Sequence, residues 1–373
     1  MSGRLRQLDF LRGIAIILVL LRHQHVTDYT STMGWMGVDL FFVLSGFLVS
    51  GLLFTEYQKH GNLKPGLFLI RRGFKIYPVY YITYLLYLIP IIRLNKFELK
   101  PFLADMTFTQ NYLNGWGYAY GASWSLAVEE HFYFGLSLVA WGIIAWYLPK
   151  ASAQNHSKSR NVITAVIVLM VSCLLLRYLH NSVWPPAKPE YNVTMTHIRI
   201  DSLLAGVLIS FFYYFRFEFL KRFVSRYKYL LMVIALAGLS WTPFIEPETS
   251  FFGKTAGYTI VYISFGIILM FFLLSDNINK QLNSVLSKHV VNFVSKIGFS
   301  SYSIYVIHSL VISYVKDYAR KFNLYEQLEL KFIIGSGISI LLGILITYSI
   351  EKYFLALRDK YFPRRGYVGK PAA

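Results

Sequence analysis

The sequence has almost no cysteine and lacks the common motifs for metals and nucleotides. Cys173 is the one cysteine in 373 residues, so no intramolecular disulfide can form and the fold does not depend on an oxidising compartment. HExxH helices, cysteine pairs, Walker loops and GxGxxG turns are absent, so we expect no metal site. The absence of a G-x-S-x-G elbow argues against a serine hydrolase of the soluble type.

Charged residues are also scarce, and apolar residues are abundant. Charged residues make up 15% of the chain and hydrophobic residues 55%, with a mean hydropathy of +0.45. This balance predicts an all-α, polytopic integral membrane protein. Acidic residues number 19 against 37 basic ones, a net charge of +18. In a soluble protein this excess would suggest nucleic acid, but in a membrane protein the positive-inside rule explains it, and we expect no nucleic-acid partner.

Apolar segments along the chain predict about ten transmembrane helices. They lie near residues 10–25, 36–55, 76–92, 123–147, 161–180, 198–215, 229–245, 256–275, 298–316 and 332–354. No linker rich in glycine and serine divides the chain. We therefore expect one domain over residues 1–373, with a membrane core over 8–355 and a basic cytoplasmic tail over 356–373.

The distribution of lysine and arginine predicts the orientation of these helices. With the N-terminus placed inside, 25 of the 37 basic residues fall on the inner side and the remaining 12 on the outer side. Because basic residues concentrate on the cytoplasmic side of a membrane, this bias places both termini in the cytoplasm. We expect a multi-pass protein of the inner (plasma) membrane, surrounded by lipid.

Arg12 and His23 bracket the first apolar segment. Their spacing of eleven residues corresponds to roughly 1100° of helix rotation, so the two side chains share a face, roughly 16.5 Å apart along the axis. Asp9 lies three residues before Arg12 and could pair with it or cap the helix. The simplest alternative is that Arg12 and His23 are anchors at the inner and outer boundaries.

The charged residues at the next two segments each allow two interpretations. Asp39 lies near the outer start of the second segment, where a carboxylate needs a partner unless it caps the helix. Arg71, Arg72 and Lys75 lie on neighbouring positions at an inner boundary. This basic cluster suits either a lipid headgroup or a soluble polyphosphate.

The fourth segment, GASWSLAVEEHFYFG, is too polar for simple packing. Ser125 and Glu129 are four residues apart and can face the same way, whereas Glu129 and Glu130 point about 100° apart. Carboxylates inside a membrane are costly and are candidates for function.

Two further groups of polar residues follow. His197 and Asp201 lie one turn apart at an outer boundary, with Arg199 between them. His308 lies in the middle of the ninth segment, where a single histidine is more often a packing residue than a catalyst.

Six motifs in this order resemble the acyltransferase family 3 membrane proteins, which acylate cell-envelope glycans and other extracytoplasmic acceptors. The motifs are LDFLRGIAIILVLLRH, GVDLFFVLSGFLVSGLL, RRGFKIYPVY, SWSLAVEEHFYF, IRIDSLLAG and SYSIYVIHSLV. The resemblance runs from about residue 8 to about residue 355, and the arginine followed by ten residues and a histidine is its most specific part.

The resemblance implies roles for the residues that match family motifs. Acyl transfer falls on Arg12 and His23, and binding of the acyl-CoA donor falls on Arg71, Arg72 and Lys75. The Ser-Leu-x-x-Glu motif falls on Ser125, Leu126 and Glu129. The sequence departs from the family at His131, where a glutamine commonly follows the glutamate pair.

We therefore expect a membrane O-acyltransferase that moves an acyl group, most simply acetyl, from cytoplasmic acyl-CoA to a hydroxyl of an envelope glycan such as lipopolysaccharide. His23 would act as general base or transient acyl carrier, Arg12 would guide the donor, and Glu129 would orient the imidazole. The residues expected to contact the acceptor are Asp39, Ser125, Arg199, Asp201 and His308.

Two other classes of protein remain open from the sequence. A proton-coupled transporter or exporter would use Glu129, Glu130, His23 and His308 as a proton relay. The lack of a detectable internal repeat counts against a transporter. A non-catalytic scaffold poorly explains so many ionisable residues in apolar segments.

Overall fold

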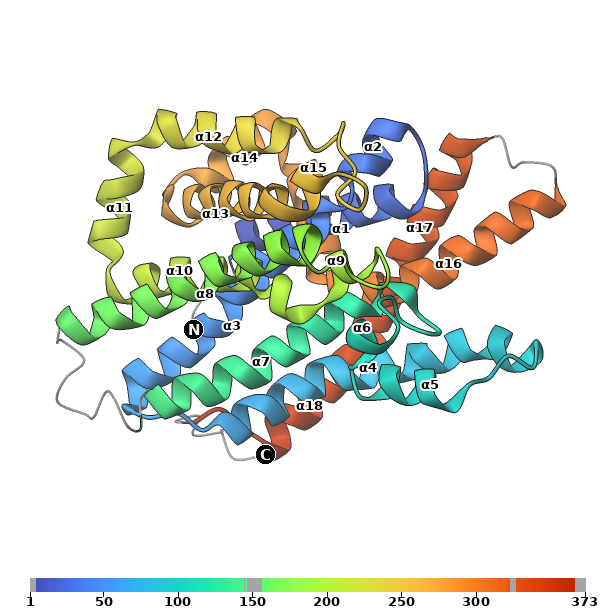
Figure 1. Ribbon diagram of the computed structural model, residues 1–373, viewed down its shortest axis with the longest axis horizontal. Helices are drawn as coiled ribbons and strands as arrows, with labels where there is room; N and C mark the ends of the chain where they lie inside the picture. Colours follow the sequence, from blue (N-terminus) through green and yellow to red (C-terminus); the bar gives the residue numbers. More distant parts are fainter. Residues whose placement is uncertain (1–4, 144, 146–155, 323–326, 366–373) are drawn as a thin grey trace.

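The computed structural model describes residues 5–143, 145, 156–322 and 327–365, and over these residues it contains helices and no strand (Figure 1). The first half of the chain forms α1 (Arg6–His23), α2 (Asp28–Met33), α3 (Met36–His60), α4 (Pro65–Arg93), α5 (Leu99–Met106), α6 (Gln110–Leu113), η1 (Gly121–Ser123) and α7 (Trp124–Gly142). The second half forms α8 (His156–Ser182), α9 (Tyr191–Thr194), η3 (Thr196–Ile198), α10 (Ile200–Phe215), α11 (Phe217–Arg226), α12 (Lys228–Ser240), η4 (Gly253–Gly257), α13 (Tyr258–Leu274), α14 (Ile278–Leu286), α15 (Lys288–Phe299), α16 (Ser301–Lys321), α17 (Leu328–Ile346), η5 (Thr347–Glu351) and α18 (Lys352–Tyr361).

Five stretches of helix in the described residues are long and apolar enough to cross a membrane. They are Asp28–His60, Pro65–Arg93, Arg160–Ser182, Gly253–Leu274 and Leu328–Tyr361. Two bent pairs, α10 with α11 at 112° and α15 with α16 at 78°, raise the number to seven if each is one span. The all-helical fold is confirmed, whereas the count of ten spans and the side of the termini stay predictions.

The segment predicted over 229–245 shows why the counts differ. It forms α12, which has only 13 residues. A helix of that length spans roughly 20 Å, short of a hydrocarbon core of about 30 Å.

Helix α1 lies inside the bundle, and α3, α15 and α16 pack against it (Figure 1). Helix α7 packs between α3 and α4, and α18 packs along α4. Helices α3 and α10 approach each other closely, and a Cβ atom added at Gly46 would lie 1.9 Å from the Leu203 carbonyl oxygen. A Cβ at Gly206 would lie 2.2 Å from the Val43 carbonyl oxygen. Small residues thus let these two helix backbones touch, which holds the frame around the site.

Candidate active site

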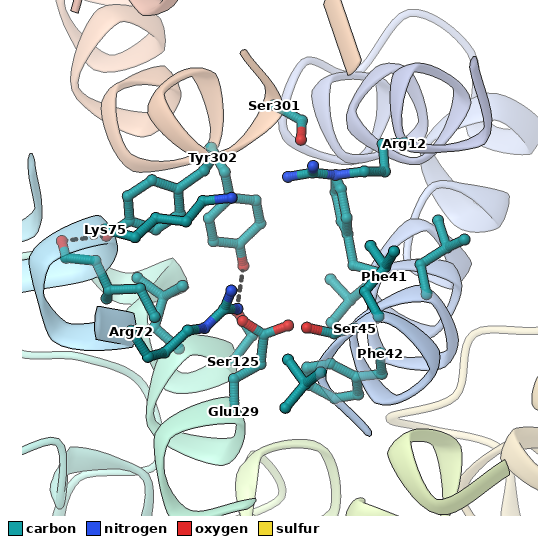
Figure 2. A pocket seen from close by; sticks show the side chains of 17 residues that line it. Arg12, Phe41, Phe42, Ser45, Arg72, Lys75, Ser125, Glu129, Ser301 and Tyr302 are labelled. Carbon is teal, nitrogen blue, oxygen red and sulfur yellow. Dashed lines mark hydrogen bonds between the residues drawn. The ribbon is translucent and has the colours of Figure 1, made fainter. Parts of the chain in front are cut away.

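A pocket of about 90 Å³ opens where α1, α3, α4, α7 and α16 meet (Figure 2). Its apolar wall comes largely from α3 and includes Phe41 and Phe42. Its polar wall is made by Arg12, Ser45, Arg72, Lys75, Ser125, Glu129, Ser301, Tyr302 and Tyr305. Five residues singled out in the sequence therefore line one cavity: Arg12, Arg72, Lys75, Ser125 and Glu129.

Three cations reach this pocket from two helices. Arg72 and Lys75 are three residues apart on α4, so they project from one face of that helix. Arg12 enters from α1 on the opposite side, next to Ser301 of α16 (Figure 2). The arrangement concentrates positive charge around a small cavity, which favours an anionic ligand.

Aromatic and hydroxyl groups hold Arg72 in place. Its Nη2 atom donates to the hydroxyl of Tyr133 at 2.6 Å, and its guanidinium carbon lies 4.3 Å from the centre of that ring. The Tyr133 hydroxyl also shares a 2.5 Å hydrogen bond with Ser45. The buried Nε atom of Arg72 has no hydrogen-bond partner among the described residues. A buried donor of this kind is available to a ligand oxygen.

Glu129 and Glu130 face different surroundings. Glu129 lines the pocket, where its carboxylate and the Arg72 guanidinium point into the same space (Figure 2). Both carboxylates interact electrostatically with Arg72. Glu130 is 5% exposed and lies outside the pocket lining, and its Oε2 accepts a 2.8 Å hydrogen bond from Tyr77. Glu129 therefore has a cation beside it, but that cation is Arg72 rather than His23.

Arg71 points away from the other two members of the basic cluster. Its Nη2 atom forms a 2.8 Å ion pair with Asp359 of α18, and Nη1 donates to the Phe362 carbonyl oxygen. It does not line the pocket. Its contact in the structure is the end of α18, and its role in binding the donor stays a prediction.

His23 lies farther along α1 than the pocket and pairs with His308. The two rings meet edge to face, with centroids 4.7 Å apart and an interplanar angle of 79°. His308 is fully buried, whereas His23 is half-buried. The Nδ1 atom of each ring lies in hydrogen-bond contact with a carbonyl oxygen of its own helix, Val19 for His23 and Tyr305 for His308. Because a carbonyl can only accept, Nδ1 carries the proton and Nε2 is left as the basic nitrogen of a neutral ring.

Tyr305 connects the pocket to the histidine pair. Its side chain lines the pocket and shares a 2.6 Å hydrogen bond with Ser125. Its ring centroid lies 5.4 Å from that of His308. Sequence reasoning assigned no role to Tyr305. The signal available was its place one turn before Ser309 on the His308 helix.

The remaining predicted acceptor contacts lie in buried ion pairs. Arg199 donates to both oxygens of Asp39 at 3.1 and 3.0 Å, and Ser202 donates to Asp39 Oδ1 at 2.9 Å. Arg177 pairs with Asp201 at 2.6 Å. All four charged side chains are at most 2% exposed, and none lines the pocket. Their geometry ties α3, α8 and α10 together, and acceptor contact by Asp39, Arg199 and Asp201 stays a prediction.

Arg177 was missed from the sequence as a functional or structural residue. It interrupts the apolar run VLMVSCLLLRYL, and an arginine in such a run needs a buried partner. Its Nε and Nη1 atoms also donate to the carbonyl oxygens of Thr255 and Ile198. No group of three or more metal-ligating side chains occurs in the described part of the chain.

Two curated relatives are similar to this chain over most of its length. The peptidoglycan O-acetyltransferase OatA of Listeria monocytogenes is 24% identical over 326 residues, covering 82% of this chain and 49% of the relative. A Staphylococcus aureus protein named "Putative O-acetyltransferase" is 25% identical over 334 residues, covering 83% of this chain and 51% of the relative. The chain spans about half the length of these relatives.

The comparison with solved structures found no match. The profile of a family described as an acyltransferase domain matches residues 5–351. Because this match covers nearly the whole chain, the protein belongs to acyltransferase family 3.

Proposed function

We propose that the protein transfers an acetyl group from acetyl-CoA, on the cytoplasmic side of the inner membrane, to a hydroxyl of a cell-envelope glycan. The names of the relatives, which include a peptidoglycan O-acetyltransferase, support a wall glycan as the acceptor. The observation that carries the proposal is the pocket with Arg12, Arg72 and Lys75 on its wall and the His23–His308 pair beyond Tyr305.

The orientation of the bundle is part of this proposal. The excess of basic residues on one side supports both termini in the cytoplasm and an even number of spans, and the ten apolar segments support ten. In this orientation the end of α1 that carries Arg12 faces the cytoplasm, and the end that carries His23 faces the outside. The donor would enter from one side and the acceptor from the other.

The three pocket cations would bind the arm of the donor inside the pocket and would attract its phosphates to the entrance. Guanidinium and ammonium groups form strong, charge-assisted hydrogen bonds with phosphate oxygens. A cavity of about 90 Å³ is far smaller than sites that enclose drug-sized ligands. It suits the acyl end of the donor, with the nucleotide outside, and its size favours acetyl over a long chain.

His23 would act as the general base. Its Nε2 atom takes the proton of the acceptor hydroxyl, and the hydroxyl oxygen attacks the thioester carbonyl carbon. The carbon–sulfur bond then breaks, and the CoA thiolate leaves with the proton returned from His23. Ser125 and Tyr305 supply hydroxyl groups beside the path. Both hydroxyls also lie within hydrogen-bond distance of the Ala122 carbonyl oxygen, and the one that turns away from it would donate to the oxyanion of the tetrahedral intermediate.

The test is acetyl transfer by the purified full chain in lipid nanodiscs. Radiolabelled acetyl-CoA and peptidoglycan fragments are supplied, and acetylated product is measured by mass spectrometry. Wild-type protein is expected to form an alkali-labile acetyl ester, and Arg72→Glu is expected to lose it. Absence of any ester from well-folded wild-type protein, over a panel of envelope glycans, would contradict the proposal. Family membership disfavours the alternative of a proton-coupled transporter.

A further inference from the structure

A second pocket, of about 50 Å³, lies just beyond the histidine pair. Its lining includes Gln24, which directly follows α1, and Ile312 and Lys316 of α16. Along α1 and into the residue after it, the order is Arg12, His23, then Gln24. On α16 the order is Ser301, His308, then Ile312 and Lys316. We call the first pocket, between Arg12 and Lys75, the donor pocket, after its proposed ligand. Along both helices, therefore, the donor pocket comes first, the histidine pair second, and this pocket third.

The wall of this second pocket is positively charged. Lys316 donates to the His23 carbonyl oxygen at 3.1 Å, which leaves further ammonium hydrogens for a ligand. Lys331 lines the pocket from the first turn of α17, where a cation opposes the helix dipole. Lys331 and Arg320 both interact electrostatically with Lys316.

Within the described residues, no carboxylate lines this pocket. His25 also lines it, and the carboxylate that pairs with His25, at 3.2 Å, belongs to the exposed Asp28. Lys316 and Lys331 thus bring ammonium groups from two helices to one small cavity, and ammonium hydrogens form charge-assisted hydrogen bonds with carboxylate or phosphate oxygens.

The floor of the second pocket is fixed. Gln24 is 5% exposed, and its Nε2 atom donates to Ser336 of α17 at 2.9 Å. A Cβ atom added at Gly335 would lie 2.2 Å from Gln24 Oε1. Glycine at this position therefore leaves room for the amide, which ties α17, the helix of Lys331, to the residue that follows His23.

We infer that this second pocket binds an anionic group, carboxylate or phosphate, of the acceptor glycan, and so places a nearby hydroxyl at His23. The inference rests on the proposed function, because it names the charge of the substrate that the same site acylates. A glycan is favoured over a free ion because the pocket adjoins the base that must reach a sugar hydroxyl. A pocket of about 50 Å³ is too small to hold the sugar ring itself, so only the charged group of the glycan would enter it.

Saturation-transfer NMR on the full chain in phosphatidylcholine nanodiscs tests this inference. The probes are N-acetylglucosamine, N-acetylmuramic acid and N-acetylglucosamine 1-phosphate, which share a ring and differ in charge. We expect at least one charged probe to bind more tightly than the neutral sugar. Lys331→Gln should weaken that binding by roughly tenfold or more, the loss typical of a hydrogen bond to a charged group. Lys321→Gln is the matched control, since Lys321 is an exposed cation on α16 that lies outside this lining.

Each outcome decides a different question. Preference for the acid or for the phosphate identifies the anion. Equal binding of all three sugars, or equal effects of Lys331→Gln and Lys321→Gln, would overturn the inference. If phosphatidylglycerol in the nanodisc abolishes binding of the charged sugar, the pocket holds lipid headgroups and the inference is wrong. Because no acetyl-CoA is present, failure here leaves acetyl transfer standing, and loss of transfer with binding intact counts only against the proposed function.

Discussion

His23 and His308 meet edge to face, 4.7 Å between ring centroids, with each Nδ1 atom held by a carbonyl oxygen of its own helix. His308 is fully buried and His23 is half-buried. The pair thus consists of one fully buried ring and one half-buried ring, and we propose that the Nε2 atom of the half-buried ring reaches the acceptor.

Replacing His23 with alanine should abolish most of the acetyl transfer. Loss of a general base typically costs 10²–10⁴ in rate, so we expect turnover to fall by roughly that factor. Binding of acetyl-CoA should remain, because His23 lies outside the donor pocket. The measurement is acetyl transfer per folded protein, together with equilibrium binding of acetyl-CoA. Near-normal turnover in folded His23→Ala protein would rule out His23 as the general base.

The two adjacent glutamates should respond differently to the same change. Glu129→Gln removes a charge beside Arg72 in the donor pocket, and we expect turnover to fall roughly 10²–10³-fold, the loss typical when one group that stabilises charge in a site is removed. Glu130→Gln keeps an oxygen that accepts from Tyr77 and should have a smaller effect. Both variants are compared in the same membranes, and a larger loss in Glu130→Gln would reverse the assignment.

The basic cluster should divide into two functions. Reversing Arg72 and Lys75 to glutamate should raise the Michaelis constant for acetyl-CoA by roughly tenfold or more, because two cations leave the pocket. Arg71→Gln should change that constant little, since Arg71 does not line the pocket and pairs with Asp359 of α18 instead. Initial rates over a range of acetyl-CoA concentrations give both values. If Arg71→Gln raised the Michaelis constant for acetyl-CoA as much as the Arg72 and Lys75 changes do, Arg71 would also belong to the donor site.

Asp39→Ala should destabilise the fold. It leaves Arg199 buried without its carboxylate, a loss that typically costs about 3–5 kcal/mol. Thermal unfolding in detergent measures this loss of stability. The double variant Asp39→Leu/Arg199→Leu removes both charges and should recover part of the stability. If Asp39→Ala unfolds at the wild-type temperature but raises the Michaelis constant of the acceptor, then Asp39 contacts the acceptor instead.

Much of the donor pocket could be predicted because helix spacing decides which side chains share a face. The four-residue spacing of Ser125 and Glu129 and the three-residue spacing of Arg72 and Lys75 place each pair on one wall. The same rule separates Glu129 from Glu130. Spacing within one helix does not say which neighbour covers the face, and this is why the contact of Arg71 with α18 could not be foreseen.

The buried ion pairs and the bends escaped prediction for a related reason. Asp201 and Arg177 lie on different helices, and the sequence names no partner for either. The number of spans was also uncertain, since hydropathy does not reveal the 112° bend between α10 and α11. Both features depend on tertiary packing rather than on local pattern.

The position of Tyr305 bears on how the protein would avoid hydrolysing its acyl donor. The tyrosine side chain lines the donor pocket and its ring lies against His308, so under the proposed function Tyr305 would stand between a thioester in the pocket and the histidine pair. Water near His23 would then be kept from the acetyl group. Such a barrier would limit wasteful loss of acetyl-CoA while no glycan is bound, and it would make the arrival of the acceptor, rather than the supply of the donor, the event that starts a turnover.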